Sequence, residues 1–134
     1  MSEPASGVPA PVFWPALTPA EAELEWPALR DWVVTLGARF PHATRVPPCW
    51  WQHNDLVELL AALRDFERAC YGAAARLTGP VEWHGAFQDI ERRLEMWVKR
   101  LGCAVGREHF HLLDEDGWRA FVAADIAARA AAVR

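Results

Sequence analysis

The 134-residue sequence has little of what marks secreted or membrane-spanning proteins. It has only three cysteines, Cys49, Cys70 and Cys103, too few and too scattered for the disulfide framework of a small secreted domain. No apolar run approaches the roughly 20 residues that span a bilayer, and the N-terminus lacks the basic and apolar regions of a signal peptide. We therefore expect a cytoplasmic protein without a membrane-spanning segment.

An excess of positive charge is also missing, because the formal net charge is −4. Proteins that bind nucleic acid through its phosphate backbone need a basic face to displace condensed counterions. The charge balance therefore disfavours nucleic acid as the main partner, although a local basic strip is compatible with it.

The common catalytic motifs are absent too. There is no phosphate-binding glycine loop, no Gly-x-Ser-x-Gly elbow and no His-Glu-x-x-His helix. Glu82, beside Trp83 and His84, is the nearest candidate for acid–base chemistry. We favour a simpler interpretation, because acidic residues at helix starts suit the helix dipole. We predict that the protein is not an enzyme.

Tryptophan, in contrast, is abundant, with eight tryptophans against one tyrosine. Apolar residues recur at helical spacing in four segments, and no segment shows the alternation of a strand. The segments run from Pro19 to about Phe40, from between Pro48 and Asn54 to about Tyr71, from after Pro80 to Gly102, and from Asp114 towards Arg134. The sequence thus predicts an all-α fold, a compact tryptophan-rich bundle of about four helices.

Local signals support these helix boundaries. Thr18 is a suitable N-cap with Glu21 three residues later, and Asp114 is suitable for the last helix. Gly102 marks the end of the third helix, whereas Pro27 either kinks the first helix or restarts it.

The two ends of the chain differ from the middle. Residues 1–16 are rich in proline and alanine and predict a flexible arm, followed by one helical domain over 17–134. Within the arm, Val12, Phe13 and Trp14 form either a docking peptide or, as we favour, an apolar lid on the domain. The alanine-rich C-terminus has little to bury, so we expect it to fray or to meet a partner.

A metal site is the most specific chemical hypothesis. Cys49 and His53 are four residues apart, and Cys103 precedes His109 by six. If the corner before the second helix lies beside the connection after the third, these four residues form a tetrahedral set that suits zinc. Packing, with His53 capping a helix or hydrogen-bonding a carbonyl, is the simpler alternative, because the Cys-x-x-Cys pairs of zinc fingers are missing. We take packing as the default and structural zinc as the hypothesis to test.

Trp50 and Trp51 suggest a second kind of site. They are consecutive, so on a helix their side chains point about 100° apart and cannot both face one core. We expect one to be buried and the other exposed, and an exposed tryptophan is a typical anchor of protein interfaces. Trp50 and Trp51 are the predicted partner-binding residues of a non-enzymatic helical adapter or regulator that binds another protein.

The alternative function is a DNA-associated accessory protein of plasmid transfer or replication. Its basic strip would be Arg92, Arg93, Lys99 and Arg100 on the third helix. Several of these residues stand four positions from an acidic residue, so solvated ion pairs are the competing interpretation.

Several motifs together resemble a known family. In chain order they are Trp-Pro-x-Leu-x-x-Trp-Val, Val-Pro-Pro-Cys-Trp-Trp-x-His, Leu-Val-Glu-x-Leu-x-Ala-Leu-Arg-Asp and Glu-Trp-His. This order resembles an actinobacterial domain family of unknown function, encoded on plasmids, integrative conjugative elements and phage-like elements. The likeness runs from about Leu24 to His109, with Asn54 where many members have proline. It implies a mobile-element setting but no activity and no catalytic residue.

Overall fold

The computed structural model describes residues 10–43, 46–103 and 113–133, and these residues are predominantly helical. The elements are η1 (Trp14–Ala16), α1 (Pro19–Arg39), η2 (Trp50–Gln52), α2 (Asn54–Tyr71), α3 (Gly79–Leu101) and α4 (Glu115–Ala132). The described ranges contain no strand. The prediction of an all-α fold with four helices is confirmed.

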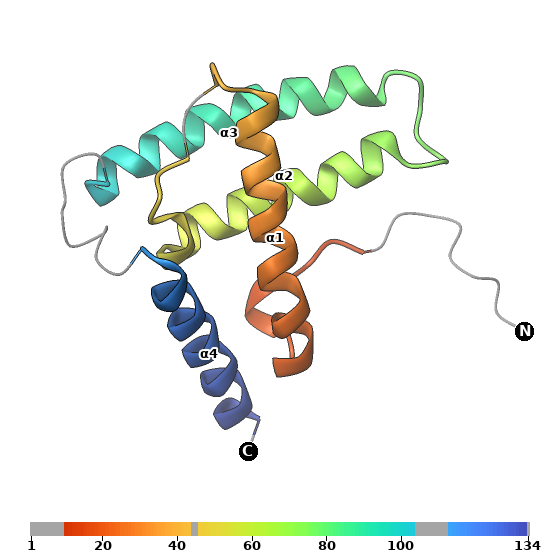
Figure 1. Ribbon diagram of the computed structural model, residues 1–134. Coiled ribbons are helices and arrows are strands. Elements are labelled where there is room, and N and C mark those ends of the chain that lie inside the picture. Colours follow the sequence, from red (N-terminus) through yellow and green to blue (C-terminus); the bar gives the residue numbers. More distant parts are fainter. Residues whose placement is uncertain (1–9, 44–45, 104–112, 134) are drawn as a thin grey trace, which may run out of the picture.

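The helices are arranged as a hairpin with two further helices laid against it (Figure 1). α2 and α3 run antiparallel side by side, α1 crosses them, and α4 lies beside the N-terminal half of α1. Because α2 and α3 are antiparallel, the start of α2 and the end of α3 lie at the same end of the hairpin. None of the described helices is both long and apolar enough to cross a membrane.

The predicted helix starts are confirmed by their capping bonds. The Glu21 amide donates to Thr18 Oγ1 over 3.1 Å and the Thr18 amide donates to Glu21 Oε1 over 2.9 Å, which is a complete capping box. These bonds lower the pKa of the Glu21 carboxyl. At the start of α4, the Gly117 amide donates to Asp114 Oδ1 over 2.8 Å.

Pro27 does not restart the first helix, because α1 is continuous from Pro19 to Arg39. Pro27 is exposed, so water can reach the backbone carbonyl that its missing N–H leaves without a helical partner. The restart alternative is therefore wrong.

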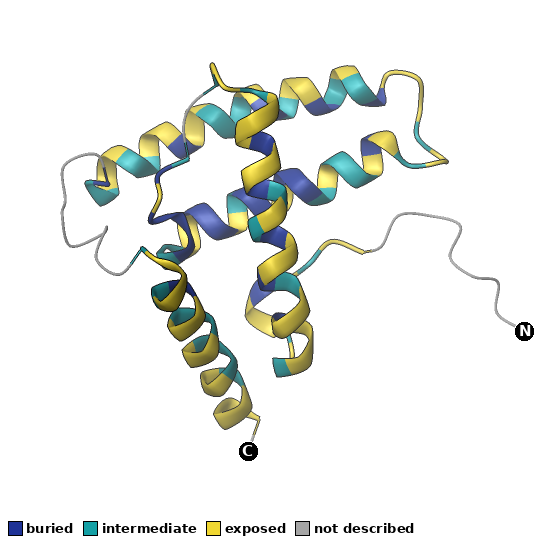
Figure 2. Cartoon of the chain, viewed as in Figure 1, coloured by how far each residue is buried: buried dark blue, intermediate teal, exposed yellow. Residues whose placement is uncertain are grey.

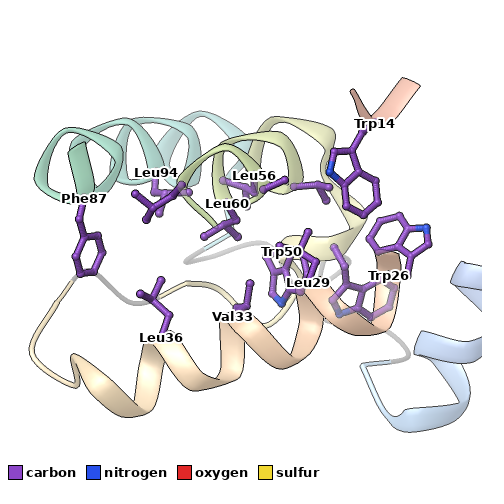
Figure 3. Close-up of a cluster of buried hydrophobic side chains, with 14 of the residues drawn as sticks. Trp14, Trp26, Leu29, Val33, Leu36, Trp50, Leu56, Leu60, Phe87 and Leu94 are labelled. Carbon is purple, nitrogen blue, oxygen red and sulfur yellow. The ribbon is translucent and has the colours of Figure 1, made fainter. Parts of the chain in front are cut away.

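The core lies where α1 crosses the hairpin. Leu29 and Val33 of α1 face Leu56 and Leu60 of α2 (Figure 3), and all four side chains are buried. Trp83 of α3 is fully buried and its indole N–H donates to the Leu63 carbonyl over 3.2 Å, so it has a polar partner inside the core.

Buried and exposed positions alternate along α2 (Figure 2), and two of its residues differ from a simple amphipathic pattern. The apolar Phe66 is 40% exposed, whereas the charged Arg64 is only 6% exposed. Arg64 is covered because Glu25 of α1 reaches its guanidinium at 2.9 Å and the neighbouring Asp65 lies at 3.3 Å. Cys70 is buried and forms no disulfide.

The described end of the N-terminal segment packs on the domain. Trp14 is buried and meets Trp26 of α1 edge-on at 4.7 Å between ring centroids, and the Val12 amide donates to Asp65 over 2.9 Å. Val12 and Trp14 therefore pack on the helical domain, as the lid alternative expected. Phe13 is exposed.

The last helix closes the bundle from the side of α1. Asp125 accepts a hydrogen bond from the Trp26 indole over 2.9 Å, and Arg129 donates to the carbonyls of Trp14 and Leu17 over 2.7 and 3.0 Å. The alanine-rich stretch is helical to Ala132. Its contacts within the chain give it something to bury, which the sequence pattern alone did not indicate.

Candidate metal centre

Three of the four predicted metal ligands come together in the structure. The ligand atoms of Cys49, His53 and Cys103 all lie within 4.8 Å of one another. Cys49 and Cys103 are 0% and 1% exposed, and His53 is half-buried. The corner before α2 therefore lies beside the end of α3, which is the condition that the zinc hypothesis requires. His109 lies outside the described residues, so its role as a ligand stays a prediction.

The corner before α2 positions the first two groups. The Trp50 amide donates to the Pro47 carbonyl over 3.0 Å, and the Gln52 amide donates to the Cys49 carbonyl over 2.9 Å. These tight turns wind residues 47–53 so that Cys49 and His53 lie close together. Pro47 and Pro48 limit the conformations of the approach.

The backbone of His53, and not its side chain, forms the hydrogen bonds at the start of α2. Its carbonyl accepts the amides of Leu56 and Val57, each over 3.0 Å, whereas its side chain makes no capping bond. The alternative that the imidazole caps α2 is therefore wrong. The imidazole lies with the two cysteines instead.

The end of α3 positions Cys103. Gly102 adopts a left-handed conformation with φ of 72°. The Cys103 amide donates to the Val98 carbonyl over 3.1 Å and the Gly102 amide donates to the Lys99 carbonyl over 3.3 Å. This pair of bonds is the Schellman motif that ends many helices. It fixes the backbone of Cys103 directly after the helix and so fixes where its sulfur can reach.

The Cys49 thiol is neutral when no cation is present. Burial, with the Cys103 thiol next to it, raises the pKa of Cys49 to about 12. A bound cation reverses this preference, because a coordinating thiol is deprotonated outright. All three cysteines are unpaired thiols in the structure.

The tryptophan prediction needs correction, because Trp50 and Trp51 are both buried. They lie in a short 3-10 helix that is covered on two sides. Trp51 packs edge-on against Trp118 and Phe121 of α4, with ring centroids 5.6 and 4.9 Å away. Trp50 points into the space between α1 and α2 (Figure 3). The exposed anchor expected at this corner does not exist.

The basic strip on α3 is exposed, and three of its four side chains lie beside an acidic residue. Arg92 and Arg93 both lie 3.1 Å from Asp89, and Lys99 lies 4.0 Å from Glu95. The guanidinium of Arg100 lies over the Trp97 ring, 5.3 Å from its centroid. Such pairing weakens the field that phosphate binding requires.

The carboxylate of Glu82 has a local partner. It accepts a hydrogen bond from Thr78 Oγ1 over 2.9 Å and pairs with Arg76, all at the start of α3. This arrangement fits the first-turn role that the sequence favoured.

Sequence reasoning missed an apolar groove of about 470 Å³ beside the corner. Its described lining comes from the end of α1, the segment before η2 and α3: Val33, Val34, Leu36, Gly37, Phe40, Pro41, Ala43, Val46, Pro47, Pro48, Trp50 and Phe87. Val34 is 67% exposed at its edge. The available signal was the consecutive pair Val33 and Val34, because two neighbours on one helix cannot both face the core.

Comparison of this chain with protein-family models, with curated proteins and with solved structures gives no match. The likeness to the actinobacterial family therefore rests on the sequence motifs alone.

Proposed function

We propose that the protein is a non-enzymatic helical adapter that binds another protein through the apolar groove beside α1. The observation that carries this proposal is the lining of the groove, in which every described residue is apolar, a glycine or a proline. Its volume of about 470 Å³ falls within the range of ligand pockets. A groove of this kind accepts the apolar side chains of a partner segment, as in the docking of an amphipathic helix.

Prolines and buried aromatic side chains line part of the groove, which favours binding. Pro47 and Pro48 form one side, and the buried Trp50 and Phe87 contribute to its base. A partner that binds such a surface loses its own freedom but does not have to order the adapter as well. Val34 at the rim is exposed in the free protein and would be covered in the complex.

An enzymatic function has less support. A depression of about 330 Å³ next to the groove is lined in part by His42, His84 and Glu91. Both histidines are exposed, so water competes with each polar contact that a substrate would make. The ion pairs along the strip on α3 likewise give the DNA-binding alternative little support. The setting of the adapter on a mobile genetic element comes from the motif resemblance.

The proposal is tested by peptide selection against the purified protein. A displayed library of random peptides is enriched on the full chain, and the binding of the enriched peptides is measured by fluorescence anisotropy. We expect peptides with two or more apolar residues at helical spacing. Val34→Glu should weaken their binding at least about tenfold, because it places a charge at the rim of an apolar site.

Leu24→Glu is the matched control. Leu24 lies on the same helix, is 75% exposed and does not line the groove. This variant should bind the peptides as the unmodified protein does. If no peptide is enriched, or if both variants bind equally well, the groove is not a docking site.

A further inference from the structure

We propose that Cys49, His53 and Cys103 bind one Zn²⁺ ion, which fastens the open end of the α2–α3 hairpin. This inference is independent of the adapter function, because the three ligand residues do not line the groove.

The distances permit a single ion to reach all three groups. Zinc binds sulfur at about 2.3 Å and imidazole nitrogen at about 2.0–2.1 Å, so a tetrahedral ion holds such atoms roughly 3.4–3.8 Å apart. In the structure the three ligand atoms lie within 4.8 Å of one another. A contraction of at most about 1.0–1.4 Å, by side-chain rotation, therefore brings all three groups to bonding distance from one ion.

The ligand chemistry selects zinc among common cations. Two thiolates and an imidazole are soft and borderline ligands, whereas magnesium and calcium require oxygen. Binding displaces the two thiol protons, and the resulting pair of thiolates leaves the bound Zn²⁺ without net charge. A neutral centre can occupy the fully buried position of Cys49 and Cys103.

The location explains what the ion would do. Residues 72–78 connect α2 to α3 at one end of the hairpin. At the opposite end, Cys49 and His53 precede α2 and Cys103 follows α3 (Figure 1). The ion would close that end and restrain the tight corner that carries Trp50 and Trp51. The two buried thiolates shield the ion from solvent, and the described residues fill three of the four positions that tetrahedral zinc takes, so the fourth ligand comes from another part of the chain or from water.

A third cysteine, Cys70, provides an internal control for the zinc proposal. Cys70 is a buried, unpaired thiol like the other two, but it lies at the far end of α2 and is not part of the cluster. If these cysteines only fill space, all three should respond in the same way to zinc and to substitution. If the cluster binds zinc, Cys70 should differ.

The first experiment measures zinc in the full chain purified under reducing conditions without chelator. We expect one zinc per chain in the unmodified protein and in Cys70→Ala, and zinc affinity reduced at least about tenfold in Cys49→Ala and Cys103→Ala. With Co²⁺ in place of zinc, the absorption spectrum should show thiolate-to-cobalt charge transfer and the visible bands of a tetrahedral ion.

The second experiment needs no variant at a ligand position, so a folding defect cannot obscure it. Zinc is removed from the unmodified protein with a chelator and then added back, and the urea unfolding midpoint is followed. The midpoint should fall and recover, because a ligand that binds only the folded state stabilises it. Absence of stoichiometric zinc and of the tetrahedral cobalt spectrum would overturn the proposal, as would full retention of zinc by Cys49→Ala.

Discussion

At the scale of single residues, Gly79 lies too close to α2 to carry a side chain. A Cβ atom added at Gly79 would lie 2.1 Å from the backbone carbonyl oxygen of Cys70 and 3.0 Å from its carbon. The obstacle is backbone, which cannot rotate away as a side chain can. Gly79 therefore allows the first turn of α3 to pack directly on the last turn of α2.

We expect Gly79→Ala to lower the free energy of unfolding by about 1–3 kcal/mol, the usual effect of forcing an extra group into a packed site. Gly85→Ala is the control, because Gly85 lies in the same helix with nothing within 4 Å of the added atom. That variant should gain up to about 1 kcal/mol from its better helix propensity. Urea unfolding of both proteins gives the comparison, and equal effects of the two substitutions would rule out this explanation.

Features of single residues could be predicted from the sequence where they depend only on residues close by in the chain. Thr18 and Asp114 cap their helices, and Gly102 ends α3, because each role needs only a few adjacent backbone groups. The exposure of Trp50 or Trp51 depends on elements far along the chain. The angle between their side chains prevents both from facing a single core, but α1 and α4 cover them from different directions.

The candidate metal site was predictable only in part, for the same reason. The spacing of Cys49 and His53 is local, but their proximity to Cys103 requires α2 and α3 to pair as an antiparallel hairpin. Short connections between amphipathic helices favour such pairing. The groove could not be found in this way, because its walls come from three separate segments.

At the scale of elements, a charged cluster joins α1 and the N-terminal segment to α2. Arg64 pairs with Glu25 of α1, and Asp65 accepts the Val12 amide and pairs with Arg68. The side chain of Arg64 is only 8% exposed, against 25% for Glu25. A helical wheel places Arg64 on the polar face, and only the crossing of α1 over that face buries it.

We expect Glu25→Ala to lower the free energy of unfolding by about 1–3 kcal/mol, because it leaves the buried guanidinium with a weaker set of partners. Glu23→Ala is a suitable control, since Glu23 is exposed on the same helix. Its effect should be within about 0.5 kcal/mol of zero, as for most surface substitutions.

A double-mutant cycle isolates the pair itself. Combining Glu25→Ala with Arg64→Met removes the unpaired charge and should recover part of the loss, because methionine fills similar space without a charge. Strictly additive effects in urea unfolding would mean that Arg64 and Glu25 are not coupled.

At the scale of the whole molecule, α4 holds together parts of the chain that are remote in sequence. Trp118 and Phe121 cover Trp51, and Arg30 of α1 pairs with Glu115 at 2.7 Å. This pair lowers the pKa of the Glu115 carboxyl. The pair is exposed to solvent, so the apolar contacts and the more buried Arg129 hold α4 in place.

Substitution of Arg129 tests how α4 is held in place, because this side chain bonds both to the N-terminal segment and within α4. Its side chain is 16% exposed and bonds to Asp125 and to the carbonyls of Trp14 and Leu17. We expect Arg129→Ala to lower the free energy of unfolding by about 2 kcal/mol, since bonds from a charged donor to partly buried acceptors are lost. Arg119→Ala, an exposed position on the same helix, should change it little.

Hydrogen exchange separates this closure from general stability. In Arg129→Ala, amide exchange should accelerate in α4 and around Trp14 more than in the α2–α3 hairpin, because the helix then opens locally while the hairpin core is intact. Uniform acceleration over the whole chain would show instead that α4 and the hairpin unfold as one unit. Unchanged exchange in α4 would mean that its apolar face alone holds it against α1.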